Sequence, residues 1–147
     1  MTRAAFRRLV SEAIDTIPPD FQQHVKNMAI VVEDEPPDEL LDEMGIEPDD
    51  TLFGLYQGTP LTERGWGHGN VLPDRITIFQ GPIEDWCEGD REAIVTEIGE
   101  TLIHELGHYF GLSEDEIQEI EDRYWHKRGG RDEDEEGEEA DEDEGPR

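Results

Sequence analysis

The feature that most constrains the fold is one long helical pattern across residues 90–111. Its apolar residues step by four and are Ile94, Ile98, Leu102, Leu106 and Phe110. This spacing places an apolar stripe along a helix. The Asp90 carboxylate can cap the amino end of that helix, and Gly111 can end it in a left-handed conformation. We therefore expect the core to form around one long buried helix.

Three short apolar runs predict strands at residues 28–32 (MAIVV), 52–57 (LFGLYQ) and 75–80 (RITIFQ). Apolar residues at helical spacing between Phe6 and Ile17 predict a first helix that stops before Pro18 and covers the sheet. Another helix should begin at Ser113, with Glu116 completing a capping box. These patterns predict an α+β fold in which a three- to four-stranded mixed sheet packs against the N-terminal helix and the long helix.

Charge divides the chain into two parts. Residues 129–147 hold eleven acidic and two basic residues and supply nine of the 28 net negative charges, so residues 1–128 carry a net charge of −19. A segment with so few apolar residues cannot offset the entropy lost on ordering. We expect one domain over residues 1–127 and a disordered acidic tail over residues 128–147.

The same acidity excludes some classes of partner. A body with this charge repels phosphate backbones and anionic lipid, so we expect neither nucleic-acid nor membrane binding. Residues 1–18 hold no continuous apolar stretch that could act as a signal peptide or membrane span. Cys87 is the single cysteine, which leaves no disulfide within the chain and favours a reducing, cytoplasmic location.

The chemistry is carried by residues 104–108, which read HELGH inside the long helical pattern. Two histidines four apart lie on one face of a helix, so the His104 and His108 imidazoles can reach a single Zn²⁺. Glu105 lies between them in sequence. It can take a proton from water that the metal activates and later give it to a leaving amine.

A third ligand is expected just after the helix. Gly111 allows a sharp turn, and Glu114 stands six residues after His108, which completes the pattern HExxHxxGxxE. The adjacent Asp115 is the alternative, and either carboxylate could instead cap or solvate the next helix. The two histidines could also be core residues without a metal, but burying three polar groups in that way is unfavourable. His68, in the glycine-rich loop at residues 58–73, could line the cleft or simply be exposed.

Three segments occur in order along the chain: LFGLYQGTPLTERG, LPDRITIFQGPIEDW and TLIHELGHYFGLSEDEI. As a set they closely resemble the bacterial minimal zincins, a family of zinc metallopeptidases with a small α+β fold, over most of residues 1–125. The resemblance implies that His104, His108 and Glu114 bind zinc and that Glu105 catalyses. Two departures stand out: many relatives have Asp at the position of Glu114, and the methionine turn of metzincins is absent.

The resulting hypothesis is a zinc metallopeptidase that acts on a peptide or protein substrate. An extended peptide would bind along the edge of strand 52–57 or strand 75–80. The alternative is a non-catalytic zinc-binding protein or peptide-binding module with the same fold. The oligomeric state and the substrate are not predicted by any feature of the sequence.

Overall fold

The computed structural model describes residues 1–46, 52–58 and 74–127. Its elements, in chain order, are α1 (Arg3–Ile14), α2 (Pro19–Val25), β1 (Ala29–Glu33), α3 (Asp38–Glu43), β2 (Gly54–Gln57), β3 (Arg75–Phe79), α4 (Gln80–Cys87), α5 (Arg91–Phe110) and α6 (Glu114–Lys127). The expected acidic tail and the loop that holds His68 lie outside the described residues. The α+β fold predicted from the sequence is confirmed.

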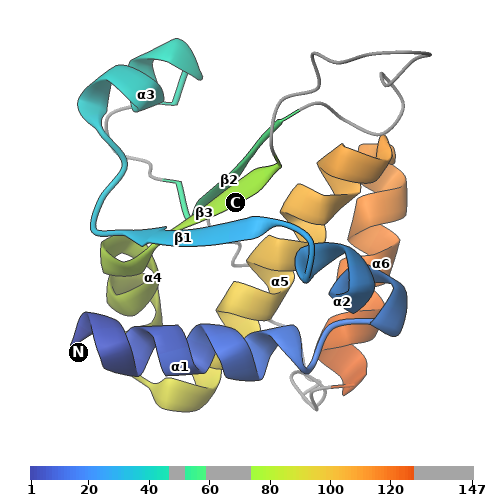
Figure 1. Ribbon diagram of the computed structural model, residues 1–147, viewed down its shortest axis with the longest axis horizontal. Coiled ribbons are helices and arrows are strands. Elements are labelled where there is room, and N and C mark those ends of the chain that lie inside the picture. The colour runs from blue at the N-terminus through green and yellow to red at the C-terminus, as the bar shows by residue number, and fades with distance from the viewer. Residues whose placement is uncertain (47–51, 59–73, 128–147) are drawn as a thin grey trace, which may run out of the picture.

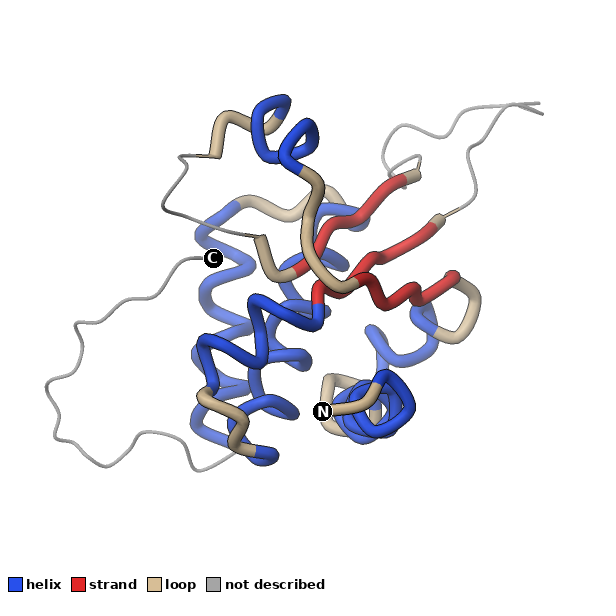
Figure 2. Tube along the Cα trace, turned by 90° about the vertical axis from the view of Figure 1, so that its left-hand side faces the viewer, coloured by secondary structure: helices blue, strands red, loops and turns tan. Residues whose placement is uncertain are grey.

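The three strands form a mixed sheet in the order β1-β3-β2 (Figures 1 and 2). β3 is central, parallel to β1 and antiparallel to β2. Both edges of β3 are therefore paired, and the hypothesis that strand 75–80 offers an open edge to a peptide is wrong. Among the described strands, β1 and β2 are the edge strands.

The core lies between the sheet and two helices. In Figure 1, α1 lies below the sheet and α3 above it, while α5 rises from the level of α1 to the level of the sheet. Ile76 and Ile78 of β3 are fully buried, and so are Phe6 on α1 and Leu102 on α5. Each such side chain contributes roughly 1.5–3 kcal/mol by burial. The long helix is thus held on several sides, which gives its side chains a fixed position.

The predicted helix ends are observed. The Asp90 carboxylate accepts a hydrogen bond from the Ala93 N–H at 2.8 Å, and Gly111 ends α5 with a φ of 75°. The Glu116 N–H donates to the Ser113 hydroxyl oxygen at 3.1 Å, while the Ser113 N–H donates to the Glu116 carboxylate at 2.8 Å. This capping box confirms where α6 begins.

Two short helices were not predicted. α2 begins at Pro19, because a proline is compatible with the first helical position even though it stops a preceding helix. The predicted strand at residues 75–80 ends one residue early, at Phe79, and Gln80 begins α4. The Gln80 amide donates to the main-chain oxygen of Met1 and to the Glu84 carboxylate, which fixes this helix start. Among the described residues, no helix is long and apolar enough to cross a bilayer.

Candidate metal centre

Two histidine rings of α5 lie side by side, one helical turn apart. The ring centroids of His104 and His108 are 4.9 Å apart, and the rings are inclined by 74°. The His104 side chain is 22% exposed and that of His108 is 44% exposed, so both rings reach the surface of the helix rather than its buried stripe. A small ion can therefore approach both rings from one side.

Glu114, in the first turn of α6, joins these histidines. One of its carboxylate oxygens lies 3.7 Å from His108 Nε2. One ligand atom from each of His104, His108 and Glu114 lies within 4.8 Å of the others, and Asp115 does not belong to this group. The left-handed turn at Gly111 brings α6 back towards α5, as the sequence predicted.

The donor set fits zinc. Two imidazole nitrogens and one carboxylate oxygen are the ligand types of catalytic zinc sites that keep one position open. Tetrahedral ligands at bond lengths of about 2.0–2.1 Å lie roughly 3.4 Å apart. The three observed atoms, all within 4.8 Å of one another, would each need only a small shift. The Glu114 side chain is 77% exposed and can make that shift by rotation.

His104 is held from behind by a carboxylate that the sequence analysis missed. Its Nδ1 lies 2.9 Å from Glu121 Oε2, and the Glu121 side chain is only 4% exposed. This hydrogen bond raises the pKa of His104 above its usual range, although burial of the ring opposes the shift. Because Nδ1 is engaged, Nε2 is the nitrogen left for a metal. Carboxylates in this position orient histidine ligands and fix their tautomer.

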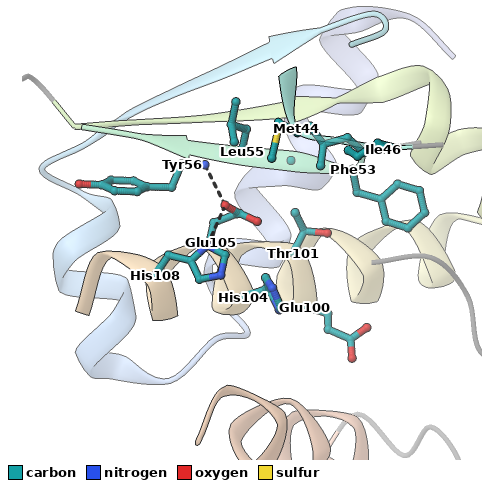
Figure 3. A pocket seen from close by; sticks show the side chains of 12 residues that line it. Met44, Ile46, Phe53, Leu55, Tyr56, Glu100, Thr101, His104, Glu105 and His108 are labelled. Carbon is teal, nitrogen blue, oxygen red and sulfur yellow. Dashed lines mark hydrogen bonds and ion pairs between the residues drawn. The ribbon is translucent and has the colours of Figure 1, made fainter. Parts of the chain in front are cut away.

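Glu105 lies on the sheet side of the two histidines (Figure 3). The main-chain N–H of Tyr56, on β2, donates to Glu105 Oε1 at 2.8 Å, and the same oxygen lies 3.7 Å from His108 Nδ1. The Glu105 carboxylate raises the pKa of His108 against the opposing effect of burial. Both histidines thus bind a proton more tightly than usual, so metal binding, which needs neutral rings, weakens towards acidic pH.

Glycines in α5 allow α6 to approach closely enough for these contacts. A Cβ added at Gly107 would lie 2.5 Å from Cγ1 of Ile117, and one added at Gly99 would lie 2.0 Å from the Tyr124 hydroxyl. Such distances leave no room for a methyl group. The spacing of α5 and α6, and with it the reach of Glu114 and Glu121, depends on both positions.

A cleft of about 280 Å³ lies between β2 and α5 and opens onto the centre (Figure 3). His104, Glu105 and His108 line one end of it. Two more residues of α5, Glu100 and Thr101, also line it. The remaining lining residues come from the chain after α3 and from the β2 segment, and they are Met44, Ile46, Leu52, Phe53, Gly54, Leu55 and Tyr56. The metal centre therefore stands at the end of a groove rather than on an open surface.

His68, the loop histidine that could line the cleft, lies outside the described residues. His126 is exposed on α6, where its Nδ1 lies 3.0 Å from the main-chain oxygen of Asp122, and it does not join the metal group. The role of Glu121 could have been predicted from the sequence. Glu121 lies between Ile117 and Tyr124 on the buried side of α6, where a carboxylate needs a partner. The Tyr56 contact could not have been predicted, because it is made by the main chain.

A comparison with known families gives a match that covers most of the chain. The model of the zincin-like metallopeptidase family matches residues 25–124, a span that includes the whole centre. The chain therefore belongs to the zincin-like metallopeptidases, a family that implies a bound metal ion, usually zinc. No curated protein matches the sequence significantly.

Proposed function

We propose that this protein hydrolyses peptide bonds, with zinc held by His104, His108 and Glu114 and with Glu105 as the general base. The observation that carries the proposal is the position of Glu105, which faces the cleft directly beside the two histidines (Figure 3). Zinc at such a site lowers the pKa of a bound water to about 7 and polarises a substrate carbonyl. The fourth position would be left for water or substrate.

Glu105 supplies proton transfer in this proposal. Its side chain is 10% exposed, and the Tyr56 N–H fixes one oxygen, so the carboxylate keeps one orientation at the cleft wall. It takes a proton from the water that attacks the scissile carbonyl. It then gives that proton to the leaving amine, which departs as a neutral group.

The peptide is proposed to lie along the outer edge of β2. The Phe79 N–H donates to the Phe53 oxygen at 2.9 Å, so residues 53, 55 and 57 face β3 and the alternate residues point their main-chain groups away from it. Those alternate residues, Gly54 and Tyr56, both line the cleft. The Tyr56 N–H already donates to Glu105, so we assign the pairing with a peptide to the main chain of Gly54. An extended peptide can add to a sheet at such an edge by main-chain hydrogen bonds.

The surroundings favour some partners over others. With a net charge of −28, the protein attracts basic peptides and repels nucleic acid and anionic membranes. Cys87 is a buried free thiol, which suits the reducing cytoplasm that we propose as the location.

The test compares the wild-type chain with Glu105→Gln and, as a matched control, Glu119→Gln at an exposed position of α6. Each zinc-loaded protein is incubated with a mixed peptide pool, with and without chelator, and new termini are identified by mass spectrometry. We expect cleavage by the wild type and the control that stops with chelator, and a loss of at least about 100-fold in Glu105→Gln with zinc retained. Zinc-dependent folding without any cleavage would favour the non-catalytic alternative.

A further inference from the structure

We infer that the end of the cleft away from the histidines is a specificity pocket that takes one bulky apolar side chain of the peptide substrate, such as Leu, Phe or Met. This inference rests on the proposed peptidase function. We call this region the apolar end and define it by Met44, Ile46, Leu52 and Phe53, all of which line the cleft.

The apolar end is continuous with the metal centre. Figure 3 shows Ile46 and Phe53 on one side of Thr101 and Glu105 and His108 on the other. Met44 lies above Thr101 in this view, between Leu55 and Ile46. A peptide that lies along β2 with its carbonyl at the centre would therefore direct a neighbouring side chain into this region. No further groove is needed to join the two parts.

Exposed apolar surface gathers at this end. The described residues include three exposed large hydrophobic side chains, and one of them, Met44 at 45% exposed, lies at this end. Another, Trp86 at 48% exposed, lies on α4 next to Phe53 and does not line the cleft. Met44 lines the cleft itself. The Trp86 ring centroid lies 6.4 Å from that of Phe53, which also lines it. Grouped apolar surface beside a catalytic cleft is typical of a binding site.

Size and charge narrow the class of side chain. The whole cleft has a volume of about 280 Å³, just below the usual range of ligand pockets, so its apolar end suits one side chain rather than a helix. Of the four lining residues that can carry a charge, His104, Glu105 and His108 belong to the other end, and Glu100 is the fourth. The Glu100 carboxylate points away from β2 (Figure 3) and accepts a hydrogen bond from the Trp125 indole of α6. A charged substrate side chain in the apolar end would therefore lose water without gaining a partner.

The test uses three hydroxamates that differ only in an attached methyl, isobutyl or benzyl group. Their dissociation constants are measured on the zinc-loaded full chain, on Met44→Glu and on the control Gln23→Glu. Gln23 is exposed on α2 and does not line the cleft, so the control adds the same charge elsewhere. We expect the isobutyl and benzyl compounds to bind the wild type about tenfold more tightly than the methyl compound. Met44→Glu should lose most of this tenfold difference in affinity, and Gln23→Glu should keep it.

Equal affinities of the wild type for the three compounds would overturn the inference. So would an equal loss, in Met44→Glu and Gln23→Glu, of the tighter binding of the isobutyl and benzyl compounds. Discrimination among the hydroxamates by a chain that cleaves no peptide would support the pocket and overturn the proposed peptidase function alone. Among cleaved peptides, a preference for Asp or Gly over Leu and Phe on both sides of the scissile bond would also overturn the pocket.

Discussion

Replacing Glu121 removes the carboxylate that holds His104 in position behind the metal centre. The bond joins His104 Nδ1 to Glu121 Oε2 at 2.9 Å, and the carboxylate is buried on α6. Loss of such a partner typically weakens metal binding by about 10- to 100-fold, which corresponds to roughly 1.4–2.7 kcal/mol. Glu121→Ala should fall near the upper value. Glu121→Gln keeps a neutral acceptor, and because charge-assisted bonds are about twice as strong as neutral ones, it should lose about tenfold.

The assay is competition for zinc between each variant and a chromophoric chelator at neutral pH. Glu119→Ala is the matched control, because Glu119 is an exposed carboxylate on the same helix. Far-UV circular dichroism and urea unfolding of the metal-free proteins show whether α6 stays folded. A folded Glu121→Ala variant that binds zinc within about twofold of the wild type would refute the orienting role.

Two further predictions concern the packing of α5. Gly107→Ala places a methyl group 2.5 Å from Ile117 Cγ1, so it should lower the free energy of unfolding by about 1–3 kcal/mol. In a chain that also carries Ile117→Ala, Gly107→Ala should lower the free energy of unfolding by clearly less, as measured by urea unfolding. Equal losses in the two backgrounds would contradict the close contact between α5 and α6 as the cause. Burial, with the nearby Glu97 and Asp90 charges, raises the pKa of Cys87 from 9.0 to about 12. The thiol of the unfolded chain ionises at a lower pH than the thiol of the folded chain. The contribution of Cys87 to the free energy of unfolding should therefore be complete below about pH 9 and smaller by about 1.4 kcal/mol at about pH 10. Cys87→Ala should lack this part of the pH dependence, and parallel urea-unfolding profiles for the two proteins would show that the thiol does not titrate in this way.

The long helix and its caps could be predicted because their signals are local. A four-residue apolar step, an aspartate before it and a glycine after it all act within one element, as Asp90 and Gly111 show. The same holds for two histidines four apart, whose convergence follows from helix geometry. The capping box at Ser113 is likewise written in adjacent residues.

Contacts between elements could not be predicted in the same way. An apolar run indicates a strand, but its place in the sheet depends on which partners it meets, and β3 became central by pairing with both β1 and β2. Gly99 and Gly107 are unfavourable in an isolated helix, and their use becomes clear only when α6 packs against them. The hydrogen bond from the Tyr56 main-chain N–H to Glu105 could not be predicted, because it does not depend on the side chain at position 56.

The central claim is that His104 and His108 bind one metal ion together. It is tested most directly by the zinc content of purified, zinc-saturated protein, measured by elemental analysis for the wild type, His104→Ala, His108→Ala and the control His126→Ala. We expect one zinc per chain in the wild type and the control, and a loss of most of the metal in each of the other two variants. Full zinc content in a folded His104→Ala or His108→Ala protein would contradict the claim.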